Sequence, residues 1–196
     1  IHKDLYDPYV VTMVEGDWSV MYEGEKLPVD KSDFSFTASG SKIRFDFAYI
    51  TIHGTPGENG ILQGYFDLIG MPYSTCGVLA SAITFNKFVC NHYLKGFGVK
   101  VSESVMLREG QTISPDEIEK NIGYPCFVKP NVGGSSFGVT KVKSAEELQP
   151  AIDKAFGEGE EVMIEAFMQG TEITCGMYKT REKKVVLPIT EVVPHN

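Results

Sequence analysis

The feature that most restricts the fold is a glycine-rich stretch, KPNVGGSSFG at residues 129–138, which lies between two strand-like segments. Before it, Cys126 to Lys129 is expected to be extended, because a proline disfavours the helical region for the residue that precedes it. After it, Val139 to Val142 has the β-branched composition of a strand. The sequence therefore predicts a strand-loop-strand flap with a glycine-rich tip.

The composition of this tip suits a polyphosphate. Glycines let backbone N–H groups approach an anion and adopt positive φ, Ser135 and Ser136 add hydroxyl donors, and Lys129 supplies positive charge. Neither GxxxxGK[ST] nor GxGxxG occurs, so a Walker A loop and a dinucleotide fingerprint are excluded. Taken alone, such a tip is also typical of a flexible turn with a solvated lysine.

Length, charge and cysteine spacing narrow the class of protein. A chain of 196 residues, 42% of them hydrophobic, can bury one large core or two small ones without disulfide or metal staples. The net charge of −8 argues against a surface that neutralises nucleic-acid phosphates. The four cysteines have neither CxxC nor zinc spacing, which predicts reduced, buried thiols. Because neither a membrane-spanning run nor a signal peptide is recognisable, we expect a cytoplasmic protein.

Apolar periodicity predicts an α/β first part and an α+β second part. We expect a domain boundary near residues 72–77, which gives domains at 1–77 and 78–196. In the first part we expect a hairpin of strands at 9–14 and 18–22, a turn-prone segment at 31–41, a strand buried on both faces at 45–52, a helix at 61–69 and a longer helix at 78–94. In the second part we expect strands at 99–107, 126–129, 139–142, 162–165, 172–178 and 185–187, a helix with a capping box at 114–117 that ends at Gly123, and a helix that opens at 144–147.

Two further segments carry candidate binding residues. The strand edge at 162–172 offers backbone groups for a flat heterocycle, with Phe167 and Met168 as walls and Glu165 and Glu172 as acceptors for an amine or for ribose hydroxyls. Lys87 lies in the helix that follows Asn86. The alternatives are a core strand with exposed acids and an ordinary surface lysine.

The sequence HGTPGENG at 53–60 lies where a predicted strand meets a predicted helix. Open α/β sheets commonly bind ligands at this position, which makes His53 and Glu58 candidate substrate contacts. The alternative is a histidine that ends the strand and a glutamate in the first turn of the helix.

Together these motifs resemble the D-alanine:D-alanine ligase family of ATP-grasp enzymes. The resemblance rests on the order and spacing of HGTPGENG, the Asn86-Lys87 pair, FVKP before the flap, GGSSFG in the flap, IEAF at 164–167 and GTE at 170–172. It covers nearly the whole chain. It implies an incomplete Rossmann-like (pre-ATP-grasp) N-terminal domain, followed by an ATP-grasp domain that is incomplete at its C-terminal end.

The resemblance also implies a role for each candidate residue. Ser135 would face the reacting carboxylates as the catalytic residue, and His53 and Glu58 would lie beside the amino-acid substrates. The two lysines and the flap would contact phosphates, and Glu165 would contact adenine. Phe167 and Met168 would form walls of the base pocket, and Glu172 would contact the ribose. The implied ATP-binding set is Lys87, Lys129, Gly133, Gly134, Ser135, Ser136, Glu165, Phe167, Met168 and Glu172.

The activity that the resemblance implies is ATP-dependent ligation of two D-alanines through an acylphosphate, for peptidoglycan precursor synthesis and hence the cell wall and cell shape. Mg²⁺ or Mn²⁺ is implied as well, with its ligands expected C-terminal to Asn196, and so is a homodimer. Two features depart from the family pattern. Asn59 stands where aspartate is more usual, and both the glycine-rich first strand and the C-terminal metal-binding part lie outside the chain.

Three alternatives stay open at this point. Another ATP-grasp carboxylate–amine ligase, such as one that makes D-alanyl-D-lactate, would have nearly the same sequence here. A nucleotide-binding module without chemistry would explain the lysines and the flap without His53 or Glu58. A purely structural α/β domain would need neither set of residues.

Overall fold

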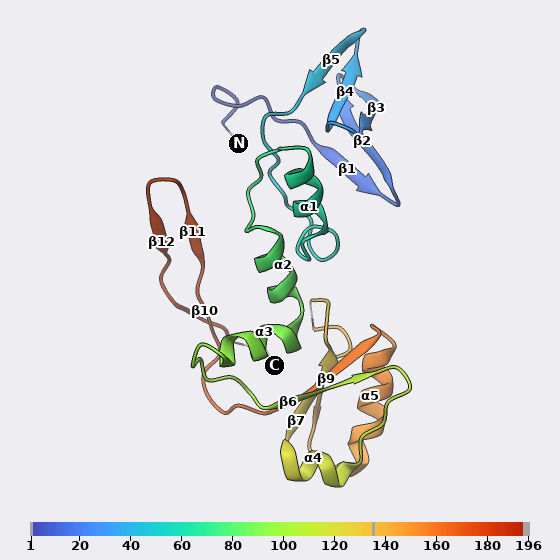
Figure 1. The fold of residues 1–196 in the computed structure, drawn as a ribbon, viewed down its shortest axis with the longest axis vertical. Coiled ribbons are helices and arrows are strands. Elements are labelled where there is room, and N and C mark those ends of the chain that lie inside the picture. The colour runs from blue at the N-terminus through green and yellow to red at the C-terminus, as the bar shows by residue number, and fades with distance from the viewer. Residues whose placement is uncertain (1, 135, 194–196) are drawn as a thin grey trace. The chain divides into compact units, whose positions relative to one another are not determined.

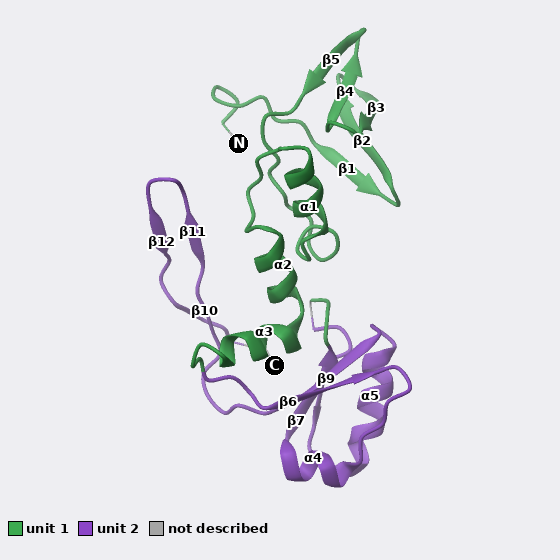
Figure 2. Ribbon diagram, in the orientation of Figure 1, with its two compact units in different colours: residues 1–99, 131–135 green, residues 100–130, 136–196 purple. Residues whose placement is uncertain are grey.

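The computed structural model describes residues 2–134 and 136–193. The chain divides into two compact units, shown in green and purple in Figure 2. Unit 1 contains residues 1–99 and 131–135, and unit 2 contains residues 100–130 and 136–196. The predicted division into domains at residue 77 stays a prediction, because units defined by contacts need not coincide with domains.

Unit 1 begins with a five-stranded antiparallel sheet in which each strand pairs with the next along the chain (Figure 1). The hairpin predicted at 9–22 is confirmed, with Val11 opposite Val20. It turns tightly because Glu15 and Gly16 both adopt positive φ, the geometry that matches the twist of the flanking strands. The strands are β1 (Val11–Val14), β2 (Asp17–Tyr22), β3 (Glu25–Asp30), β4 (Ser35–Ala38) and β5 (Ser41–Arg44).

The expectation of a turn-prone segment at 31–41 is wrong, because β4 lies within it. Phe36 on this strand is 1% exposed and Ser35 is fully buried. The Ser35 hydroxyl donates to Asp33 Oδ1 at 2.5 Å. The hydroxyl is therefore hydrogen-bonded within the protein and not to solvent. For this reason the polar composition wrongly predicted a turn where a strand lies.

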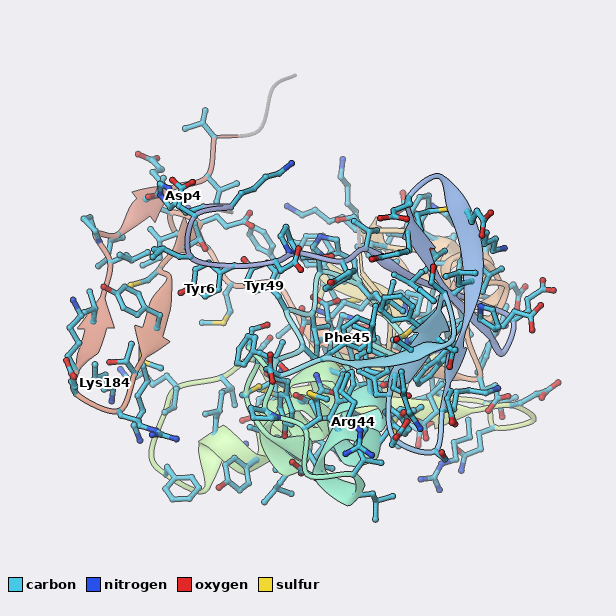
Figure 3. The ribbon with its side chains drawn as sticks, turned by 90° about the horizontal axis from the view of Figure 1, so that it is seen from above. Asp4, Tyr6, Arg44, Phe45, Tyr49 and Lys184 are labelled. Atoms are coloured by element: carbon cyan, nitrogen blue, oxygen red, sulfur yellow. The ribbon has the colours of Figure 1, made fainter. Side chains whose placement is uncertain are left out.

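The strand predicted at 45–52, buried on both faces, is also wrong. Only Ala48 forms a ladder bridge, parallel to Tyr73, and Phe47 and Tyr49 are 53% and 70% exposed; Tyr49 is labelled in Figure 3. The backbone N–H of Ala48 donates to the carbonyl of Pro72 at 2.9 Å. Apolar composition predicts burial on both faces only for a segment that has a strand on each side. Among the described residues, this segment has one such neighbour, at Tyr73.

Three helices follow: α1 (Ile61–Leu68), α2 (Val78–Phe85) and α3 (Lys87–Lys95). The helix predicted at 61–69 is confirmed, whereas the one predicted at 78–94 is two helices. The chain leaves the helical conformation at Asn86, where ψ is 106°, and the Asn86 Oδ1 then accepts the N–H of Val89 at 2.9 Å. Asparagine is among the preferred N-cap residues, so it ends one helix and starts the next.

The core of unit 1 is aromatic. Phe34, Phe36 and Phe66 are almost fully buried, and the rings of Phe34 and Phe66 meet edge to face at 5.0 Å between centroids. Trp18 packs against Tyr65 of α1 at 4.9 Å in the same manner. Such pairs add stability beyond the area they bury, and they fix α1 against the sheet.

Unit 2 contains a four-stranded antiparallel sheet of order β6-β9-β7-β8 (Figure 1). The predicted strands at 126–129, 139–142 and 162–165 are confirmed, whereas the one predicted at 99–107 begins only at Ser104. The capping box predicted at 114–117 is confirmed, because the Ser114 and Glu117 side chains bond each other's backbone N–H. The elements are β6 (Ser104–Arg108), α4 (Pro115–Asn121), β7 (Cys126–Pro130), β8 (Thr140–Val142), η1 (Ala145–Glu147), α5 (Leu148–Phe156) and β9 (Glu161–Ala166).

Two short ribbons complete unit 2. The strand predicted at 172–178 is interrupted, and its halves pair with different partners: β10 (Ile173–Thr174) with β13 (Thr190–Glu191), and β11 (Met177–Lys179) with β12 (Lys184–Val186). Gly176 lies between the halves. The two ribbons are largely exposed, in contrast to the four-stranded sheet.

One face of the four-stranded sheet forms the core of unit 2. Val128, Val162 and Ile164 are fully buried there against α5, together with Ile152 and Leu148 of that helix. Side chains alternate along a strand, so Lys129 and Glu165, next to these residues, belong to the opposite face. The core thus fixes where these two charged residues point.

The cysteines are free thiols, as predicted, but only in part buried. Cys126 is buried and Cys90 partly so, whereas Cys76 and Cys175 are exposed. Burial raises the pKa of the Cys126 thiol to about 11. The expectation that all four are buried is wrong because Cys76 and Cys175 lie outside the helices and strands. Among the described residues, no helix is long and apolar enough to cross a bilayer.

Candidate active site

The loop HGTPGENG folds back on itself in unit 1. The backbone N–H of Gly54 donates to Glu58 Oε2 at 2.6 Å, and His53 Nδ1 lies 3.6 Å from Glu58 Oε1. The His53 side chain is 95% exposed, which leaves its ring open to a ligand. Gly57 has no room for a Cβ, because that atom would lie 2.2 Å from the carbonyl oxygen of Ile52. The loop thus holds His53 and Glu58 side by side.

Gln63 on α1 holds this loop in place through hydrogen bonds. Its side chain is fully buried, and Nε2 donates to the carbonyl of Gly57 at 2.7 Å and to Thr75 Oγ1 at 2.9 Å. Gln63 Oε1 is buried without a hydrogen-bond partner among the described residues. Sequence reasoning missed Gln63, since a glutamine on an amphipathic helix is ordinarily a surface residue.

Lys87 occupies the first position of α3 and reaches the glycine-rich stretch. Its Nζ donates to the carbonyl of Gly133 at 2.9 Å and to that of Asn131 at 3.4 Å. Asn131 is fully buried, and its Oδ1 accepts the N–H of Phe88 at 2.9 Å. The start of α3 and the glycine-rich stretch are therefore joined by two kinds of donor, the Lys87 ammonium and the backbone N–H groups of Lys87 and Phe88.

One pocket of unit 1 collects several of these groups. It has a volume of about 260 Å³ and is lined by Glu58, Thr84, Phe85, Lys87 and Gly133. A carboxylate, an ammonium and a glycine backbone thus face one space. Thr84 and Phe85 were not predicted, although their place directly before the Asn86-Lys87 pair was a usable signal.

The glycine-rich stretch carries the backbone freedom that its composition suggests. Gly133 has φ of 108° and Ser136 has φ of 59°, both in the left-handed half of conformational space. Positive φ favours glycine at such positions and costs little at Gly133. Gly134 has open space around its α-carbon. Ser135, the predicted catalytic residue, lies outside the described residues.

In unit 2, the two predicted ATP contacts Lys129 and Glu165 touch each other. Lys129 Nζ donates to Glu165 Oε1 at 2.5 Å, and the two side chains are only 19% and 16% exposed. Sequence reasoning assigned these residues to opposite ends of a nucleotide. The antiparallel pairing of β7 with β9 instead makes them diagonal neighbours, because Lys129 lies opposite Met163 and Phe127 opposite Glu165.

The predicted walls of a base pocket lie just beyond β9. Phe167 is 37% exposed, and Lys141 Nζ lies 3.6 Å from the centre of its ring. Met168 is 63% exposed and Glu172 is exposed as well. Lys141 was not predicted as a site residue. The available signal was its place on β8 next to buried Val142, because neighbouring side chains on a strand lie on opposite faces. Among the described residues, no group of three or more His, Cys, Asp or Glu is placed to hold a metal ion.

Comparisons with known proteins identify the family of the chain. The family model for the D-ala D-ala ligase C-terminus matches residues 93–196. D-alanine–D-alanine ligases of Phocaeicola vulgatus and Parabacteroides distasonis are 65% and 60% identical over the whole chain, which spans 61% and 60% of their lengths. The chain therefore covers about three fifths of the curated relatives it matches.

Solved structures give the same result for the fold. D-alanyl-alanine synthetase A from Vibrio cholerae superposes with a TM-score of 0.83 at 28% identity, over 96% of this chain and 58% of that one. VanG D-Ala:D-Ser ligase from Enterococcus faecalis has a TM-score of 0.83 at 30% identity, over 97% and 61%. The α/β and α+β fold is thus that of the ATP-grasp ligases. The chain belongs to the D-alanine–D-alanine ligase family.

Proposed function

We propose that the protein joins two D-alanines at the expense of ATP. In this proposal the carboxylate of one D-alanine takes the terminal phosphoryl group, and the amine of the second attacks the acylphosphate and releases phosphate. The product serves peptidoglycan precursor synthesis. The observation that carries the proposal is the 260 Å³ pocket in which Glu58, Lys87 and Gly133 meet, in a chain of this family.

Each group in the pocket suits one demand of the reaction. The Lys87 ammonium and the backbone of the glycine-rich stretch stabilise phosphate charge, which is the main task of a protein in phosphoryl transfer. Glu58, already held by the Gly54 N–H, provides a carboxylate for the amine of an amino acid. His53 beside it supplies a second polar contact for substrate. These groups position reactants and need form no covalent bond to them.

The remaining assignments extend the proposal to the nucleotide. Lys129, Gly134 and Ser136 contact phosphates, Glu165 accepts from the adenine amino group, and Phe167 and Met168 flank the base. Glu172 accepts from the ribose, and Ser135 faces the reacting carboxylates. The flap excludes water that would hydrolyse an acylphosphate. Mg²⁺ or Mn²⁺ belongs to the proposal as well, with ligands outside the described residues, and no step here is assigned to the metal.

The test is phosphate release by the protein expressed over the full length of its gene. MgATP and D-alanine should release phosphate and form the dipeptide, whereas L-alanine and reactions with EDTA should not. D-serine and D-lactate are assayed together with D-alanine, because VanG, a relative at 30% identity, is a D-Ala:D-Ser ligase. A faster rate with either of these would change the second substrate and leave the reaction type in place. ATP binding with no turnover under all these conditions would contradict the proposal and favour a non-catalytic nucleotide module.

The proposal also includes a cytoplasmic homodimer with a domain boundary at residue 77. A cytoplasmic location fits an enzyme that consumes ATP. Light scattering after size exclusion gives the mass in solution, and a monomer would contradict the dimer without affecting the reaction.

A further inference from the structure

The contact between Lys129 and Glu165 is fixed by the fold of unit 2 and differs from an ordinary exposed ion pair. Surface ion pairs are exposed and contribute little, but here both side chains are more than four fifths buried. The Nζ–Oε1 distance of 2.5 Å is a direct charge-assisted hydrogen bond. Both residues lie on adjacent strands whose opposite faces are locked in the core. The rigid sheet therefore sets their separation.

The surroundings of Glu165 make Lys129 its specific partner. Among the described residues, Lys129 is the cation within 4 Å of the Glu165 carboxylate. Lys141, on β8 opposite Phe127, lies instead over the ring of Phe167. Ser104 is opposite Glu165 on β6, and its hydroxyl is buried without a partner among the described residues. The charge of Glu165 is thus balanced by one ammonium.

This pairing has a consequence for the binding of phosphate. A partly buried ammonium that is already bonded to a carboxylate is neutralised, and a phosphate group must compete for it. Removing the ammonium altogether leaves the carboxylate uncompensated, which is costly in a site of low exposure. Glu165 therefore controls both the position of the Lys129 ammonium and how strongly it attracts an anion.

We propose that Glu165 is a positioning residue for Lys129, and that its carboxylate competes with nucleotide phosphate for the Lys129 ammonium. This inference rests on the proposed function, since it assumes that Lys129 meets a nucleotide. A carboxylate accepts several hydrogen bonds, so Glu165 can accept a neutral N–H, such as the amino group of adenine, with or without the ammonium.

The experiment is a double-mutant cycle read by calorimetry with two probes, adenosine and a non-hydrolysable MgATP analogue. The ratio of their dissociation constants isolates the phosphate contribution, because any loss of the adenine contact affects both probes. In Glu165→Gln, which keeps the shape but not the charge, the preference for the triphosphate should rise about three- to tenfold. In a Lys129→Met background the same change should alter the ratio less than about twofold.

Two results would overturn the inference. One is an unchanged ratio in Glu165→Gln, and the other is an equal rise in the Lys129→Met background, which would mean a long-range charge effect. Lys129→Arg serves as a second background in case the methionine variant does not fold, and there the response to Glu165→Gln should persist. Glu161→Gln is the matched control, because it removes the same charge from β9 but pairs with Arg108.

Unfolding of the same four proteins without nucleotide gives an independent readout. A direct pair predicts that the effects of the two single substitutions on stability are not additive, whereas additivity would contradict it. If the wild type binds neither probe, the proposed function fails together with the proposed competition, even where the two residues are coupled in stability. If the wild type binds both probes but the ratio does not respond, only the inference fails.

Discussion

At the scale of single residues, Lys87 combines a structural and a chemical task. Its ammonium already bonds the carbonyls of Gly133 and Asn131, so the side chain is held at the start of the glycine-rich stretch. An ammonium fixed in this manner loses less conformational entropy when an anion arrives.

Lys87→Met should weaken binding of the MgATP analogue about ten- to a hundredfold, since a hydrogen bond to a charged group contributes about 1.5–3 kcal/mol. Adenosine affinity should change little. Calorimetry measures both, with Lys95→Met on the same helix as a control for net charge. Equal losses for both ligands would show that the lysine supports only the fold.

Gln63→Met should lower the free energy of unfolding by about 1–3 kcal/mol, because it leaves the buried carbonyl of Gly57 without its donor. The loop that carries His53 and Glu58 should loosen, so KM for D-alanine should rise more than KM for ATP. Urea unfolding and steady-state kinetics test the two parts. Gln149→Met on α5 is the control, because that glutamine is exposed; a similar loss there would contradict a specific brace.

At the scale of elements, the helix ends are where side chains decide the fold most visibly. Asn86 ends α2 and caps α3, and Ser114 caps α4 with Glu117 in return. Both caps satisfy backbone N–H groups that the helix itself cannot pair. Each one also sets the direction in which the following helix leaves, which for α3 determines where Lys87 lies.

Removing the α4 cap should change both the stability of the protein and the dependence of that stability on pH. Ser114→Ala should cost about 0.5–2 kcal/mol in stability. Hydrogen bonds from the Ser114 N–H and hydroxyl lower the pKa of the Glu117 carboxyl below its ordinary value. That contribution is present above the unfolded-state pKa and is lost as pH falls through the folded-state pKa.

Glu117→Gln should therefore be less stable than the parent at neutral pH and should approach it in acid. Urea unfolding at a series of pH values from about 7 to about 3 tests this, with Glu119→Gln on the same helix as control. A difference that stays constant over this range would contradict a role for the charge.

Strong local signals were predicted correctly at this scale, and signals that depend on distant partners were not. The capping box, the turn of the first hairpin and the extended chain before Pro130 are set by neighbouring residues, so the sequence contains them. The segment at 45–52 failed because its burial depends on strands elsewhere. The Lys129–Glu165 contact depends on the register of β7 with β9, which neither segment encodes alone.

At the scale of the whole molecule, the described residues form two cores that share no residue. One is the aromatic cluster around Phe34 and Phe36, and the other is the aliphatic cluster around Val128 and Ile152. The loop that carries His53 and Glu58 lies beside the first core, because Ile52, next to His53, packs against the aromatic cluster. Family membership and the order of motifs were predictable at this scale, whereas the grouping of residues into units was not.

Separate cores predict separate responses to damage. Phe36→Leu should cost about 1–3 kcal/mol and lower the hydrogen-exchange protection of β2 to β4, with little change in β7 and β9. Ile152→Val should do the reverse, at about 0.5–1.5 kcal/mol. Exchange measured by mass spectrometry on peptides from each unit tests this. Loss of protection throughout the chain from either substitution would show a single cooperative unit.

Because the thiols differ in exposure, two of them can be labelled selectively to follow motion between the units. Cys76 belongs to unit 1 and Cys175 to unit 2, both open to solvent, while Cys126 is shielded and resists deprotonation. Fluorophores attached through maleimide should therefore enter one natural site in each unit before they reach the shielded thiol. With Cys90 replaced by serine, energy transfer between the two dyes would report any change in the distance between the units when nucleotide is added.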